Sequence, residues 1–205
     1  FVDQMVDNTE DGKMSMSIIP YATQVSLPEE FLSEFNVTSE HNFSHCVNFS
    51  ATDFDTTEIN DSTALERTMH FDIWRTSDRR PSNRLVSYPI CESDSDREVL
   101  IMQKDRNTLK SFISNLSARG NTSIDLGMKW GTALLDPSVK TATNAMIADG
   151  IVSADFVSRP RPFNDGDTLK VIVLMTDGQN TSQYYIDEDF RTGSSSVWWN
   201  NSAQR

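Results

Sequence analysis

One short stretch, residues 170–180 with the sequence KVIVLMTDGQN, constrains the fold more than any other part of the chain. Its apolar run, residues 171–175, is uninterrupted and rich in β-branched residues, which is typical of a strand buried on both faces of a parallel sheet. The run ends in Thr176, Asp177 and Gly178. Ligands of open α/β sheets bind beyond the carboxyl ends of the strands, so we expect Asp177 at a ligand-binding edge. There the carboxylate either pairs with a bound cation or caps the following turn.

The composition fits one acidic globular domain. The chain has 205 residues, of which 37% are hydrophobic, and this is enough for a single sizeable core. Its net charge of −12 disfavours nucleic-acid backbones and anionic membrane surfaces as partners. No apolar run reaches the roughly 20 residues that span a bilayer, and no secretory signal segment opens the chain. Phe1, Val2 and Met5 are typical of a helix already under way, so we expect the middle part of a longer protein.

A strand is predicted where Met14, Met16 and Ile18 alternate with serines. Beyond it, a polar stretch with few periodic apolar positions predicts an insertion, about residues 36–104, with short strands of its own.

Both cysteines, Cys46 and Cys91, lie in polar, loop-like sequence within this insertion. A disulfide between them would stabilise the fold by roughly 4 kcal/mol in the chain-entropy model and would imply an oxidising compartment. Two free thiols are the alternative.

Two helices follow the insertion. The first has an N-cap at Asp105 or Asn107, apolar residues at helical spacing, and a stop at Gly120. A second helical pattern covers residues 124–135. The order of helices and strands predicts an α/β fold with a mostly parallel sheet.

Two glycines in the second helix, Gly127 and Gly131, are four residues apart. This spacing predicts close packing of that helix against a neighbouring element. It carries no weight as a transmembrane pairing motif in so short and polar a segment.

The candidate chemistry depends on two loops. Thr122 follows the stop at Gly120, and Asp177 ends the apolar run. A hydroxyl and a carboxylate are hard oxygen donors that suit Mg²⁺ or another divalent cation. Thr122 is equally well explained as the N-cap of the second helix.

The motifs MSIIPYATQVSLP, GNTSIDLGMKWGTALLDP and KVIVLMTDGQNT, in this order, resemble a von Willebrand factor type A domain. More narrowly, they resemble the domain of tight-adherence (Flp) pilus-assembly proteins of the TadG type, which the pair Trp130-Gly131 and the insertion with two cysteines also match. The resemblance implies a Rossmann-like, mostly parallel sheet flanked by helices, with a metal-ion-dependent adhesion site. It places Thr122 and Asp177 among the metal ligands.

The chain departs from this family in one respect: it contains no Asp-x-Ser-x-Ser motif, which is the family's first metal loop. We therefore expect residues 1–205 to be a single partial domain, truncated at both ends. Such a chain would hold Mg²⁺ or another divalent cation weakly or not at all.

The function that the resemblance implies is a non-enzymatic interaction module in pilus assembly or adhesion. It would be extracytoplasmic, in the bacterial periplasm or at the cell surface, and anchored by a segment outside these residues. Its partners would be other pilus-system or envelope proteins that offer an acidic group to the ion. The alternatives are a metal-dependent hydrolase with Asp177 as a ligand, and a metal-free structural scaffold.

Two other polar clusters are weaker candidates. His41 and His45 are spaced like zinc ligands on a helix, but they lack the glutamate and the apolar face of a zinc-protease motif. The acidic residues between Glu92 and Glu98 alternate as in a calcium loop but lack its glycine, which favours a solvated loop.

Overall fold

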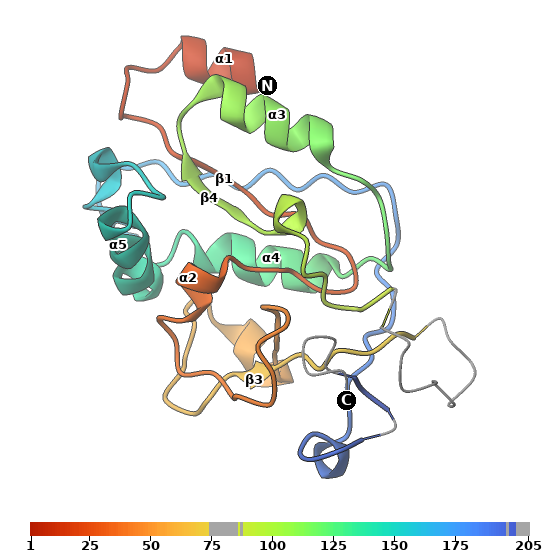
Figure 1. Cartoon of the computed structure of the whole chain (residues 1–205). Coiled ribbons are helices and arrows are strands. Elements are labelled where there is room, and N and C mark those ends of the chain that lie inside the picture. Colours follow the sequence, from red (N-terminus) through yellow and green to blue (C-terminus); the bar gives the residue numbers. More distant parts are fainter. Residues whose placement is uncertain (74–85, 87, 196, 200–205) are drawn as a thin grey trace.

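The computed structural model describes residues 1–73, 86, 88–195 and 197–199. Its helices are α1 (Val2–Asp7), α2 (Glu29–Leu32), α3 (Arg106–Asn115), α4 (Ile124–Ala133) and α5 (Lys140–Ala148). Its strands are β1 (Met16–Ile18), β2 (Val47–Asn48), β3 (Glu66–Arg67) and β4 (Leu100–Gln103). Short 3-10 turns occur at Ala51–Asp55, Ser95–Arg97, Pro137–Val139, Ala154–Phe156 and Glu188–Phe190. Figure 1 shows α1 beside α3 at one end, the strands β1 and β4 in the middle, and α4 on the other side of these strands.

The strands form two small antiparallel sheets. β1 pairs with β4, with Met16 opposite Gln103, and β2 pairs with β3, with Val47 opposite Arg67. In the described part of the chain, parallel pairing is limited to isolated bridges, such as that between Ser26 and Glu98. The predicted α/β character is therefore present, but the predicted Rossmann-like parallel sheet is not formed by these residues.

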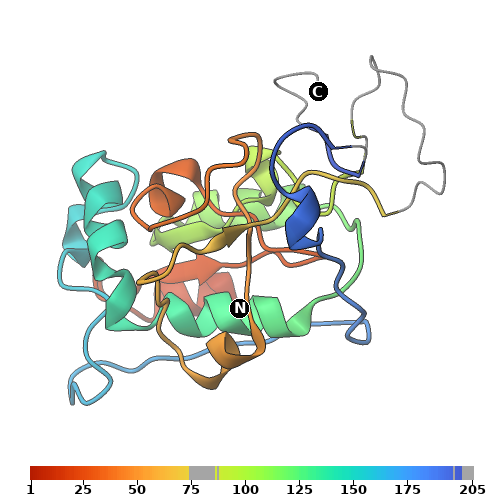
Figure 2. The ribbon, with the colours of Figure 1, turned by 90° about the horizontal axis from the view of Figure 1, so that it is seen from below.

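The prediction of a buried strand at residues 171–175 is wrong for this structure. The segment is extended but makes no strand pairing, and Val173 and Met175 are 56% and 81% exposed. Figure 2 shows it at the margin of the molecule, beside α4. An apolar, β-branched run predicts an extended conformation, whereas burial also requires a neighbouring strand on each side, which the described residues do not provide.

Helix α3 begins where the sequence indicates and ends earlier. The Asp105 side chain accepts a hydrogen bond of 2.7 Å from the Thr108 amide, which confirms it as the N-cap. The helix ends at Asn115 rather than at Gly120. Gly120 has a φ of +80°, and a Cβ atom there would lie 2.9 Å from Oγ1 of Thr23, so the loop that leads to α4 requires glycine.

Helix α5 was not anticipated. Its sequence, KTATNAMIA, is polar and weakly periodic, so the helical pattern is hard to detect. The helix buries Ala142, Thr143 and Met146, which lie on one face. Packing of this face against α2, together with the preceding 3-10 turn, outweighs the modest helix propensity of its threonines.

The predicted close packing of α4 is confirmed at Gly127, whereas at Gly131 a Cβ atom would make only an ordinary van der Waals contact. A Cβ atom on Gly127 would lie 2.8 Å from the ring of Tyr21, and one on Gly131 would lie 3.9 Å from Cδ1 of Ile172. Helix α4 therefore supports both the segment after β1 and the extended segment of residues 171–175.

The insertion shares its core with the rest of the molecule. Trp130 of α4 is 1% exposed, and its ring lies 5.5 Å from that of Phe49 in the insertion and 6.3 Å from that of Phe31 in α2. β4 lies within the predicted bounds of the insertion but pairs with β1. Residues 74–85 and 87 of the predicted insertion lie outside the described residues.

The disulfide between Cys46 and Cys91 is present, with an S–S distance of 2.06 Å. Both cysteines are completely buried, although their surrounding sequence is polar. The main-chain oxygen of Cys46 accepts a hydrogen bond of 2.9 Å from the Thr68 amide.

No helix in the described residues is long and apolar enough to cross a membrane.

Candidate functional site

The two loops that the sequence singles out meet in the structure. The Thr181 amide donates a hydrogen bond of 2.9 Å to the main-chain oxygen of Thr122, and the Thr122 amide donates one of 3.0 Å to Oγ1 of Thr181. The same hydroxyl lies 3.1 Å from the Thr122 oxygen, to which it donates. Both polar groups of the Thr122 main chain are thus satisfied by one residue of the other loop.

The N-terminus of α4 is capped from this second loop. Oδ1 of Asn180 accepts a hydrogen bond of 2.8 Å from the Ile124 amide, which has no partner inside the helix. The N-cap residue is Ser123, whose own hydroxyl instead donates to the Thr23 oxygen at 3.0 Å. The alternative interpretation of Thr122 as the N-cap is therefore wrong.

Thr122 faces the residue next to Asp177. A Cβ atom on Gly178 would lie 3.1 Å from Oγ1 of Thr122, closer than most such contacts, so a side chain at this position would crowd the hydroxyl. Asp177 itself is exposed, and Thr122 is half-buried. Thr122 and Gly178 are thus brought together at the end of the extended segment, whereas an approach of the Asp177 carboxylate to the Thr122 hydroxyl stays a prediction.

These donors are of the right type for a hard cation but form only part of a shell. A hydroxyl and a carboxylate suit Mg²⁺, and the Thr122 hydroxyl makes no hydrogen bond within the described part of the chain. No group of three His, Cys, Asp or Glu side chains that could hold a metal ion occurs among the described residues. Thr122 and Asp177 alone would leave most of the six octahedral positions of Mg²⁺ to water.

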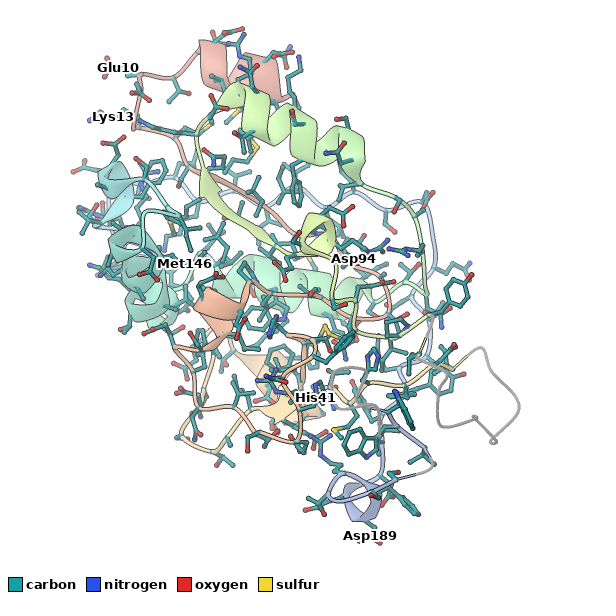
Figure 3. The ribbon with its side chains drawn as sticks, viewed as in Figure 1. Glu10, Lys13, His41, Asp94, Met146 and Asp189 are labelled. Atoms are coloured by element: carbon teal, nitrogen blue, oxygen red, sulfur yellow. A yellow bond between two sulfur atoms is a disulfide. The ribbon has the colours of Figure 1, made fainter. Side chains whose placement is uncertain are left out.

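His41 and His45 contact different groups of the protein. Nδ1 of His41 accepts a hydrogen bond of 3.2 Å from the Phe43 amide, so Nε2 carries the proton and donates to the Thr68 oxygen at 2.9 Å. Burial lowers the pKa of His41 below its ordinary value of 6.5. His45 instead faces Glu98 at 3.9 Å. Figure 3 shows His41 among the side chains of the insertion, away from the end that carries α1 and α3.

Two carboxylates of the acidic loop of residues 92–98 pair with one arginine. Arg119 pairs with Asp94 at 2.9 Å and lies 3.6 Å from Glu92. Burial raises the pKa of the Glu92 carboxyl. Residues 93–96 are exposed, so the loop is largely solvated, as the sequence favours, and two of its carboxylates face Arg119.

Asn180 and Thr181 were not assigned a role from the sequence. Their only signal is their position, directly after the turn that carries Asp177, and both are common in solvated loops. Their contacts to Thr122 and Ile124 join positions separated by 59 and 56 residues, and no periodicity in a single sequence reports such a pairing.

Comparison with protein-family models, with curated proteins and with solved structures finds no match to this chain in any of the three.

Proposed function

We propose that this chain is part of a non-enzymatic interaction module of the von Willebrand factor A type, which acts in a cell-envelope pilus-assembly or adhesion protein. It holds a divalent cation at the turn of Asp177 together with Thr122, and it presents this cation to an acidic group of a partner. The module is extracytoplasmic, and the buried disulfide between Cys46 and Cys91 is compatible with such a compartment.

The observation that carries this proposal is the apposition of Thr122 and the Asp177-Gly178 turn. The two come from loops far apart in the chain, and a Cβ atom on Gly178 would approach the Thr122 hydroxyl to 3.1 Å. The Thr122 hydroxyl is thereby brought to within one residue of Asp177, whose carboxylate would supply a second oxygen donor of the kind that Mg²⁺ prefers.

The physical basis of recognition is the residual charge of the cation. A hydroxyl is neutral, so a site with one carboxylate leaves a divalent ion with net positive charge. An Asp, Glu or C-terminal carboxylate of a partner can then complete the coordination shell. The acidic surface of this chain, with a net charge of −12, disfavours acidic partners everywhere except at such a cation.

Further ligands are expected from the first metal loop of the family, which these residues lack. The chain of residues 1–205 should therefore bind Mg²⁺ only weakly, whereas a longer polypeptide that includes a strand ending in Asp-x-Ser-x-Ser should bind it saturably. Calorimetry on both proteins measures this difference.

The decisive variant is Asp177→Ala, with Asp149→Ala as its control, since both residues are exposed. In the longer protein, Asp177→Ala should abolish Mg²⁺ binding and Asp149→Ala should leave it unchanged. Equal binding by the two variants would refute Asp177 as a ligand, and tight Asp177-dependent binding by residues 1–205 would show that the further loop is unnecessary.

A further inference from the structure

The two loops of the site differ in how firmly the rest of the molecule holds them. The loop that leads into α4 is anchored: the Ser123 amide donates a hydrogen bond of 2.8 Å to the Ala22 oxygen, and the buried Ser123 hydroxyl bonds the Thr23 oxygen. Its position is therefore fixed by the segment after β1.

The loop that carries Asp177 has much weaker support. It follows the exposed segment of residues 171–175, in which the Met175 oxygen accepts one hydrogen bond from the Tyr21 hydroxyl. Every residue from 171 to 180 is exposed. Packing alone therefore does not determine where Asp177 lies relative to Thr122.

The contacts made by Asn180 and Thr181 supply the missing constraint. Thr181 satisfies both the amide and the oxygen of Thr122, and Asn180 satisfies the Ile124 amide at the N-terminus of α4. These hydrogen bonds reach from the weakly held loop to the anchored one. They involve neither the Thr122 hydroxyl nor the Asp177 carboxylate, so both groups remain available to a ligand.

We propose that Asn180 and Thr181 are positioning residues, which fasten the Asp177 turn to the Thr122 loop before any ion binds. Their effect on the ion rests on the function proposed above, whereas their effect on the two loops does not. The two loops are then already held together when the ion binds, so binding costs less conformational entropy.

A cysteine pair can report this apposition directly. A Cβ atom on Gly178 would lie 3.8 Å from Cβ of Thr122, which is the mean Cβ separation of a disulfide. Both native cysteines are already bonded to each other, so Thr122→Cys with Gly178→Cys introduces the only free thiols of the described residues. The rate at which the new disulfide forms then measures how often the two loops are together.

Matched substitutions at Asn180 separate positioning from general stability. Asn180→Ala removes the acceptor and should slow the cross-link about two- to tenfold, the factor that corresponds to one hydrogen bond. Asn180→Asp keeps an acceptor oxygen at the helix N-terminus and should retain the native rate. Thr181→Val and Thr181→Ser form a second pair with the same expectation, since only serine retains the hydroxyl.

Amide hydrogen exchange in proteins without the added cysteines gives an independent measurement. Asn180→Ala should remove the protection of the Ile124 amide and leave that of the Ser123 amide, which is bonded to Ala22. Equal cross-linking rates in the alanine and aspartate variants, or loss of protection at both amides together, would overturn the positioning role. Neither measurement needs an ion, so a failure of Mg²⁺ to bind counts against the proposed function alone.

Discussion

The hydroxyl group of Tyr21 donates a hydrogen bond of 2.8 Å to the main-chain oxygen of Met175. The ring of the same tyrosine packs on Gly127, where a Cβ atom would lie 2.8 Å from two ring carbons. Tyr21 thus links the segment after β1, helix α4 and the extended segment that ends at Asp177. Because the whole length of its side chain separates the two main chains, the extended segment does not pair directly with the chain at Tyr21.

The first prediction concerns the contact between Tyr21 and Gly127. Alanine in place of a helical glycine ordinarily stabilises a protein by up to about 1 kcal/mol. At Gly127 the added methyl group must displace the tyrosine ring, and overpacking of this kind costs about 1–3 kcal/mol. We therefore expect Gly127→Ala to lower the free energy of unfolding, measured with urea.

Gly166→Ala is the control, because nothing lies within 4 Å of a Cβ atom at that position. Its free energy of unfolding should change little. A Gly127→Ala protein that is as stable as the control would show that the Tyr21 ring moves aside without cost.

The sequence alone is sufficient to predict features of the fold that depend on the chemistry of one or two residues. Asp105 caps α3 because a carboxylate three residues before a free amide suffices for a cap. Gly127 lies on the packed face of α4 because a side chain at this position would collide with the ring of Tyr21. The disulfide could be expected because the chain has two cysteines in all.

Properties set by distant residues could not be predicted in this way. The run of residues 171–175 has the composition of a buried strand, but its exposure is decided by which segments lie beside it. Likewise, residue type and position indicate Thr122 and Asp177, whereas the roles of Asn180 and Thr181 depend on a fold that brings their loop to α4. The sequence therefore indicates the candidate donors but not the contacts that hold them.

The second prediction concerns pH and the buried side chain of His41. Burial lowers its pKa in the folded protein, and protonation of Nδ1 would also break the hydrogen bond from the Phe43 amide. As the pH falls below the ordinary value of 6.5, the unfolded chain binds a proton at His41 before the folded chain does. Stability from this group is thus present above that pH and is lost as the pH falls towards the folded pKa.

Urea unfolding between about pH 5 and pH 7 measures this loss. His41→Gln should flatten the pH dependence in this window, because glutamine does not titrate. His45→Gln is the control, since His45 faces Glu98 rather than two main-chain groups, and it should retain the part of the slope that comes from His41. A His41 pKa at or above 6.5 by NMR titration would contradict the prediction.

The last prediction concerns the exposed segment of residues 171–175. The exposure of its side chains alternates. Ile172, which lies against Gly131 of α4, and Leu174 are 39% and 46% exposed, whereas Val171, Val173 and Met175 are 61%, 56% and 81% exposed. The segment is thus extended, uncharged and rich in β-branched residues, and it has no strand partner in the described part of the chain. Edges of this kind pair with other chains unless a charge or proline interrupts them.

We therefore expect the chain to self-associate as its concentration rises, and we expect Val173→Lys to oppose this association. Val157→Lys is a closely matched control, because Val157 is 57% exposed against 56% for Val173, and both changes alter the net charge equally. Sedimentation velocity over a range of concentrations should show fewer oligomers for Val173→Lys only. If both lysine variants reduce association alike, the effect comes from net charge, and the extended edge is not the contact between chains.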